Sequence, residues 1–123
     1  MSSLRFLDAR SGALTVSLDG RLLHSRFDPV REAERFVSPL TESRPRLAVV
    51  VGPGLGYAFE AIRRLHPGVR TLALQLFTEL ADRAVARADS TWTPGSEPID
   101  RFLTRELTDL DTASLAILEW QPV

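Results

Sequence analysis

The distribution of apolar positions along the chain predicts alternating strands and helices. The run Leu47 to Val51 is continuously apolar and rich in β-branched residues, which is typical of a buried parallel strand. The glycine-rich segment 52–56 (GPGLG) follows it directly, and apolar positions then recur at helical spacing up to Leu65. A strand, a tight glycine turn and a helix in this order are typical of the unit that opens a Rossmann-type sheet.

The rest of the chain after this unit continues the alternation. Residues 69–77 are predicted to form the second parallel strand, and Thr78 is predicted to cap a helix that runs to Ala88. A short third strand is expected over 91–93, a helix over 98–107 and a last strand over 115–120. This order predicts an α/β fold, in which a Rossmann-like parallel sheet with right-handed crossovers carries flanking helices.

The residues before the apolar run predict a small appendage. Apolar and polar residues alternate over 14–18, Asp19-Gly20 suits a two-residue turn, and a second short run follows, so a β-hairpin is expected. Asp28 is a good N-cap and Pro29 suits the first helical position, so a helix should start there. We therefore divide the chain into a hairpin-and-helix appendage, residues 1–44, and a partial Rossmann-like unit, residues 45–123, within one compact domain.

The last predicted strand should have an uncovered edge. In a doubly wound sheet a strand at this place in the order is flanked on both sides. An exposed strand edge is a template for pairing with another chain. We therefore expect residues 115–120 to be covered by a further domain of a longer protein or by a partner chain, a homo-oligomer included.

Composition narrows the classes of function. A net charge of −1 provides no basic field for nucleic acid, and no apolar stretch approaches the roughly 20 residues that cross a bilayer. The N-terminus lacks the apolar core of a signal peptide, so we expect a cytoplasmic protein. With two histidines, no cysteine and no carboxylates at ligand spacing, the sequence predicts no metal site.

The glycine turn is the main candidate for chemistry. Its G-x-G-x-G spacing departs from the dinucleotide fingerprint, which would place a glycine at Tyr57, and looks more like the first motif of S-adenosylmethionine-dependent methyltransferases. Gln75 falls where an acidic residue holds ribose hydroxyls in such folds, and an amide supplies no anionic acceptor. The ligand therefore stays open between a nucleotide sugar and an S-adenosylmethionine-like molecule. The predicted binding residues are Gly52, Gly54, Leu55, Gly56, Tyr57 and Gln75.

The same glycines have a second interpretation, in which they only let the helix pack closely against the strand. Two interpretations also apply to His24, which could act as a general base because its ordinary pKa lies near neutrality. Alternatively His24, Ser25 and Asp28 tie the hairpin to the helix start through side-chain-to-backbone hydrogen bonds. Glu119 is a further candidate, because the carboxyl end of a strand is where open α/β sheets place functional groups.

Two of these segments together resemble a known family. A hairpin glycine, then Leu-His-Ser, an aromatic residue, Asp-Pro and Glu-Ala, precede a strand that ends in Gly-x-Gly-Leu-Gly-Tyr. This order is similar to the motility-associated factor glycosyltransferases and the related 6-hydroxymethylpterin diphosphokinase-like proteins. The later segments 92–94, 102–103 and 119–122 also look like the spirochaete-type members of this family. The matching positions are Gly20, Leu23, His24, Ser25, Phe27, Asp28, Pro29, Glu32, Ala33, Gly52, Gly54, Leu55, Gly56 and Tyr57.

The resemblance implies a protein that attaches nonulosonic-type sugars to flagellin from a nucleotide-activated donor. It covers only the N-terminal part of the family protein, and the transferase centre of the family lies mostly downstream. The expectation is therefore a Rossmann-like leading domain that is not catalytic alone. Two alternatives stay open: an interaction or oligomerisation module without a ligand, and an S-adenosylmethionine-dependent methyltransferase-like domain.

Overall fold

A three-stranded antiparallel sheet forms the N-terminal part of the chain. The computed structural model describes residues 3–80, 82–108 and 112–121. Strands β1 (Leu4–Asp8), β2 (Leu14–Leu18) and β3 (Arg21–Leu22) pair in the order β1-β2-β3. The predicted hairpin is confirmed as β2–β3, and its turn residues Asp19 and Gly20 both have positive φ, as this type of tight turn requires. Strand β1 is an addition that the apolar pattern did not predict.

A four-stranded parallel sheet forms the rest of the fold. Strands β4 (Leu47–Val51), β5 (Arg70–Leu74), β6 (Ser90–Trp92) and β7 (Leu115–Glu119) lie in the order β6-β5-β4-β7. Counted along the chain, the parallel strands thus run 3-2-1-4, which is the order of the first half of a Rossmann sheet and its switch point. The predicted α/β fold with a parallel sheet is confirmed.

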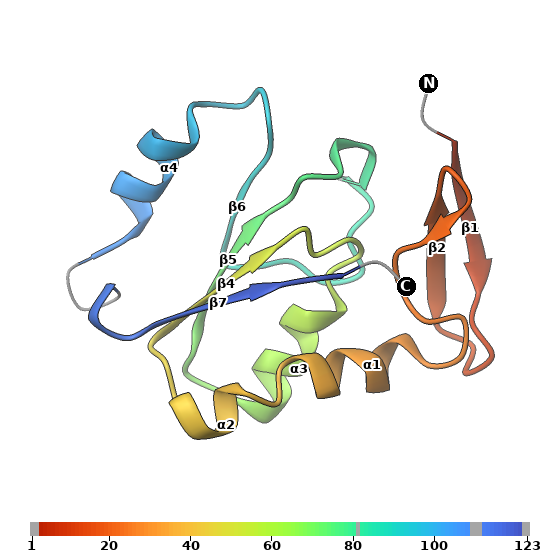
Figure 1. Ribbon diagram of the computed structural model, residues 1–123, viewed down its shortest axis with the longest axis horizontal. Coiled ribbons are helices and arrows are strands. Elements are labelled where there is room, and N and C mark those ends of the chain that lie inside the picture. The colour runs from red at the N-terminus through yellow and green to blue at the C-terminus, as the bar shows by residue number, and fades with distance from the viewer. Residues whose placement is uncertain (1–2, 81, 109–111, 122–123) are drawn as a thin grey trace.

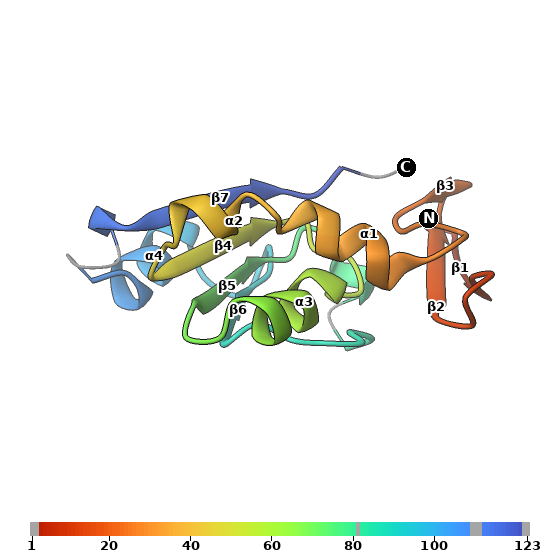
Figure 2. The ribbon, with the colours of Figure 1, turned by 90° about the horizontal axis from the view of Figure 1, so that it is seen from below.

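Helices cover both faces of the parallel sheet. Figure 1 shows α1 (Pro29–Phe36), α2 (Leu40–Ser43) and α3 (Tyr57–Leu65) below the sheet and α4 (Ile99–Glu106) above it, and Figure 2 views the sheet from the side of α1 and α3. Successive side chains of each strand point to opposite faces of the sheet. Ala48 and Val50 share a core with α1 and α3, whereas Leu47 and Val49 pack with Phe102 of α4.

The segment after β5 differs from the prediction. The expected helix from Thr78 to Ala88 is wrong: a single 3-10 turn, η1 (Thr78–Leu80), is followed by non-helical chain, and Ala81 lies outside the described residues. The amides of Val85 and Ala86 donate to the carbonyl of Leu55 instead of to their own helix. A tertiary acceptor has therefore overridden the helical propensity of an alanine-rich segment.

The antiparallel sheet lies at the carboxyl ends of the parallel strands. In Figure 1 the arrows of β4 and β7 point toward β1 and β2. The indole Nε1 of Trp120, just after β7, donates to the carbonyl of Leu23, just after β3, at 2.6 Å. One core joins the two parts, since Val16 and Leu23 pack in the same buried cluster as Val50 and Ile62. Within the described ranges, no helix combines the length and apolar character that a bilayer crossing requires.

Candidate functional site

The glycine turn has the predicted strand–turn–helix arrangement. Strand β4 ends at Val51, the turn occupies 52–56, and α3 begins at Tyr57. Gly52, Gly54 and Gly56 all have positive φ, between 60° and 87°, a conformation that only glycine adopts at little cost. The turn therefore needs glycine at these positions for its backbone alone, before any ligand is considered.

His24 lies directly against this turn. Its imidazole Nε2 accepts a hydrogen bond from the Leu55 amide at 2.8 Å, and its ring packs edge-on against Tyr57 and beside Trp120. The residue is completely buried, and this burial lowers its pKa to about 4. The neutral imidazole carries its proton on Nδ1, for which the described residues provide no acceptor. The lone pair that a general base needs is thus engaged by the backbone of the turn.

Gln75 also contacts the turn. Its side-chain amide donates to the carbonyl of Gly54 at 2.7 Å, and its carbonyl oxygen accepts from the Phe77 amide at 3.3 Å. Tyr57 directs its hydroxyl away from the turn, to the carbonyl of Leu14. Burial raises the pKa of this hydroxyl, and the nearby carboxylate of Glu60 raises it further.

The space beside the glycines is filled by the chain itself. A Cβ on Gly54 would lie 2.6 Å from Nε2 of His24, and one on Gly56 would lie 2.0 Å from the carbonyl oxygen of Ala86. The cavity between the turn, Gln75 and the 84–88 segment has a volume of about 20 Å³. That volume is enough for about one water molecule and far below the size of a nucleotide site.

Three further predicted residues lie away from the turn. Ser25 Oγ accepts from the amides of Phe27 and Asp28, and Asp28 Oδ1 accepts from the Arg31 amide as the N-cap of α1. Glu32 closes the same junction by accepting from the Ser25 amide, and burial raises the pKa of its carboxyl. Glu119 is exposed on β7 and borders a shallow pocket of about 150 Å³ beside Phe36 and Trp120.

The structure therefore separates the predicted residues into three groups. The turn residues, His24 and Gln75 form one buried cluster. Ser25 and Asp28 connect β3 to α1, and Glu119 belongs to the edge of the parallel sheet. The prediction that the turn binds a ligand stays a prediction, but the amide of Leu55 and the carbonyl of Gly54 already have partners within the chain.

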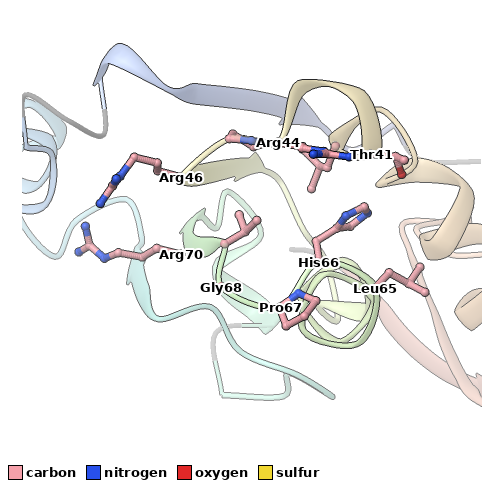
Figure 3. A pocket seen from close by; sticks show the side chains of 11 residues that line it. Thr41, Arg44, Arg46, Leu65, His66, Pro67, Gly68 and Arg70 are labelled. Atoms are coloured by element: carbon pink, nitrogen blue, oxygen red, sulfur yellow. The ribbon is translucent and has the colours of Figure 1, made fainter.

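A much larger cavity lies at the opposite end of the parallel strands. It has a volume of about 770 Å³ and opens between α2, the end of α3 and the starts of β4 and β5 (Figure 3). We call it the basic pocket. The residues that line it are Leu40, Thr41, Arg44, Pro45, Arg46, Leu65, His66, Pro67, Gly68, Val69 and Arg70. No local motif marks this pocket in the sequence, although Arg46 directly precedes β4 and Arg70 begins the neighbouring parallel strand β5, so the two must meet at one sheet edge.

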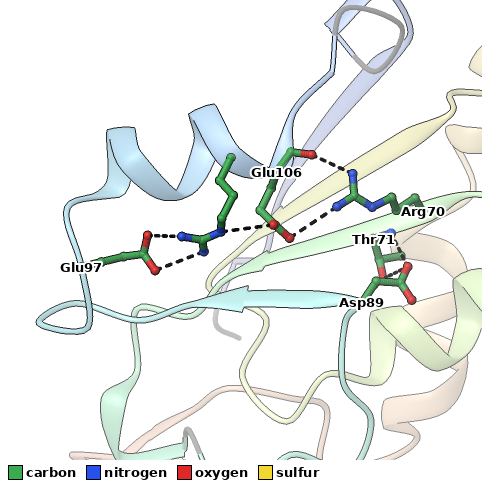
Figure 4. A network of polar contacts seen from close by, with 6 residues as sticks. Arg70, Thr71, Asp89, Glu97 and Glu106 are labelled. Atoms are coloured by element: carbon green, nitrogen blue, oxygen red, sulfur yellow. Dashed lines mark hydrogen bonds and ion pairs between the residues drawn. The ribbon is translucent and has the colours of Figure 1, made fainter.

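A polar network beside this pocket fastens α4 to the sheet (Figure 4). Arg70 donates to the main-chain carbonyl of Glu106 at 2.7 Å and forms an ion pair with its carboxylate at 3.4 Å. Arg105 in turn forms a two-pronged pair with Glu97. The guanidinium of Arg70 is therefore partly neutralised, in contrast to those of Arg44 and Arg46, for which no ion pair occurs among the described residues.

Among the described residues, no three histidine or carboxylate side chains lie close enough together to hold a metal ion. Comparisons with protein-family models, with curated proteins and with solved structures find no match to this chain.

Proposed function

We propose that this chain is a non-catalytic, Rossmann-like domain of a motility-associated glycosyltransferase-type protein, and that β7 is the attachment point for a further strand–helix unit of the same polypeptide. The assignment to that class of protein rests on the resemblance of residues 20–33 and 52–57, and the assignment to the cytoplasm rests on an N-terminus without the apolar core of a signal peptide. The assignment of an assembly role rests on β7, and above all on the exposure of Ile117.

Ile117 is an apolar residue in a place that a completed sheet would bury. It pairs with Val49 in the parallel register, and Val49 is 5% exposed beneath α4, whereas Ile117 is 65% exposed. Strand alternation puts both side chains on the face that α4 covers, so α4 stops short of β7. A second helix on this face is what a Rossmann sheet normally supplies beyond its fourth strand.

The backbone of β7 supports the same proposal. The amide of Trp120 donates to the carbonyl of Val51, and the carbonyl of Ser114 accepts from the amide of Leu47. The backbone N–H and C=O groups of the even-numbered residues of β7 therefore point toward β4. The peptide groups of Ile117 and Glu119 therefore point away from β4, along the open edge. Because the four strands of this sheet are parallel, a fifth strand would extend it in the same direction.

The glycine turn has a packing role in this proposal. The contacts of Gly54 with His24 and of Gly56 with Ala86 account for both glycines without a bound molecule. Nucleotide-sugar binding and methyl transfer at the turn are therefore not part of the proposed function.

Hydrogen exchange of β7 tests the proposal. The protein purified at the length that the cell makes is compared with residues 1–123 produced alone. We expect the peptide that contains β7 to exchange more slowly in the longer protein, on the order of a hundredfold. Strand β6, at the other edge of the sheet, is the internal control and should exchange equally in both. Equal exchange of β7 in both proteins would overturn the proposal. So would the finding that the cell makes a protein of 123 residues that stays monomeric.

A further inference from the structure

We infer that the basic pocket binds a small organic phosphate, with the phosphate held by Arg44 and Arg46. This inference goes beyond the proposed function and does not depend on it, because the pocket lies at the end of the sheet opposite the glycine turn. Its volume of about 770 Å³ lies within the range of small-molecule sites in proteins.

The charged side chains that line the pocket are all arginines. Arg44, Arg46 and Arg70 line it together with His66, and no carboxylate is among the lining residues. Figure 3 shows Arg44 and His66 on facing sides of the hollow, and Arg46 next to Arg70 at one end. The main chains of Arg46 and Arg70 are joined by a hydrogen bond of 2.9 Å, so their side chains start from adjacent positions. Since α3 ends rather than begins at the pocket, side chains and not a helix N-terminus supply the positive charge.

Guanidinium groups with no carboxylate partner are suited to phosphate. The planar fork of arginine matches two phosphate oxygens at once, and it carries its charge at any physiological pH. Arg70 is engaged by Glu106, so Arg44 and Arg46 are the two groups with capacity for a new anion. Leu65, which is 46% exposed, and Pro67 form an apolar wall for an uncharged part of the ligand.

The backbone at Arg44 is the second, independent observation. Arg44 caps α2 in the left-handed conformation, with φ 44° and ψ 56°. Glycine is the usual residue at such a helix end, and arginine is not among the side chains that tolerate it well. Strained positions of this kind cluster at binding sites, where the side chain has a use that outweighs its cost. The guanidinium of Arg44 at the pocket rim supplies that use.

Titration of ¹⁵N-labelled residues 1–123 by NMR tests the inference. The probes are pyrophosphate, uridine diphosphate, uridine and citrate, at constant ionic strength. We expect saturable shifts of the amides of Thr41, Arg44, Arg46 and Gly68 with both phosphates, and tighter binding of uridine diphosphate than of pyrophosphate. Uridine should bind weakly, because it lacks the anion.

Charge-matched variants keep the test specific. Arg46→Gln and Arg44→Gly should each weaken the binding of uridine diphosphate by at least about tenfold. Arg44→Gly also relieves the left-handed strain, so a loss of binding in this variant does not come from misfolding. Arg31→Gln, on the exposed side of α1, removes the same charge elsewhere and should leave the affinity within about twofold. Absence of saturation at millimolar probe, an equal loss in Arg31→Gln, or citrate binding as tightly as uridine diphosphate would each overturn the inference.

Discussion

The side chain of His24 accepts a hydrogen bond from the main chain of Leu55, at a nitrogen–nitrogen distance of 2.8 Å. This contact joins the exit of the antiparallel sheet to the turn at the centre of the parallel sheet. In a nucleotide-binding protein, an amide at this place faces the ligand. Here the N-terminal part of the chain supplies the acceptor itself.

The buried imidazole predicts a loss of stability in acid. Burial lowers the pKa of His24 from 6.5 to about 4, so between these values the unfolded chain binds a proton that the folded chain does not. The free energy of unfolding should therefore fall as the pH decreases through this window, by about 3 kcal/mol in total at pH 4. Urea unfolding at a series of pH values measures the slope.

Two variants isolate this effect. His24→Gln retains an acceptor for the Leu55 amide but does not titrate, so the slope due to His24 should disappear. His66→Gln removes the other histidine of the chain and is the matched substitution control. Glu32 contributes with the opposite sign just above its ordinary pKa, because burial raises its pKa and the folded chain keeps that proton longer. A slope that persists in His24→Gln would show that another group causes it.

Replacing a glycine of the turn by alanine should lower the free energy of unfolding more than replacing a glycine with free space around it. Gly12→Ala introduces only the strain of positive φ, about 1 kcal/mol, because no atom lies within 4 Å of the new Cβ. Gly54→Ala and Gly56→Ala add clashes with His24 and with the Ala86 carbonyl, so losses of about 3 kcal/mol or more are expected. Equal losses at all three positions in urea unfolding would contradict the close packing of the turn.

Glycine at position 44 should stabilise the chain. Arg44→Gly removes the strain of a left-handed backbone at a residue with a side chain, which costs roughly 1–2 kcal/mol. Part of this gain is offset because glycine has more conformational freedom in the unfolded state. We expect a net gain of about 0.5–1 kcal/mol in thermal or urea unfolding. Arg46→Gly, where no positive φ exists, is the control and should not stabilise. A destabilised Arg44→Gly would mean that contacts of the arginine side chain support the fold.

Charge at the open sheet edge should suppress self-association. Among the residues that the structure describes, no strand pairs with the outer edge of β7, so residues 1–123 should associate weakly at high concentration. Ile117→Lys should abolish this in sedimentation equilibrium while it changes the free energy of unfolding by no more than about 0.5 kcal/mol. Phe27→Lys alters an apolar residue of similar exposure away from β7 and should leave the association intact. Equal effects of the two variants would argue against a role of the β7 edge.

The parts of the fold that the sequence predicted are those governed by local signals. The apolar run of β4 and the Asp28-Pro29 start of α1 carry strong local preferences, and both elements form where expected. Strand β1 lacks a clean alternation of buried and exposed residues, so period-two reasoning did not detect it. The predicted helix after Thr78 failed because the carbonyl of Leu55, distant in sequence, captures the amides of Val85 and Ala86.

The candidate sites depend still more on distant contacts. The sequence leaves His24 with two interpretations, and neither names Leu55 as its partner, because pairing across 31 residues has no local signature. The basic pocket draws its arginines from the end of α2, from the residue before β4 and from the start of β5. Each of these residues, considered alone, looks like an ordinary solvated surface residue. Only the parallel order of β4 and β5 reveals that they converge.

The bond from Trp120 to Leu23 spans 97 residues, and it has a consequence for how the chain is made. Strand β4 cannot acquire its neighbour β7 until nearly all of these residues have left the ribosome, and pairings so far apart in sequence form slowly. Strands β1, β2 and β3 leave the ribosome before β4, yet the Trp120 indole that binds the Leu23 carbonyl follows 97 residues after Leu23. These three strands therefore reach their final position only after β7 has been synthesised, long after their own synthesis.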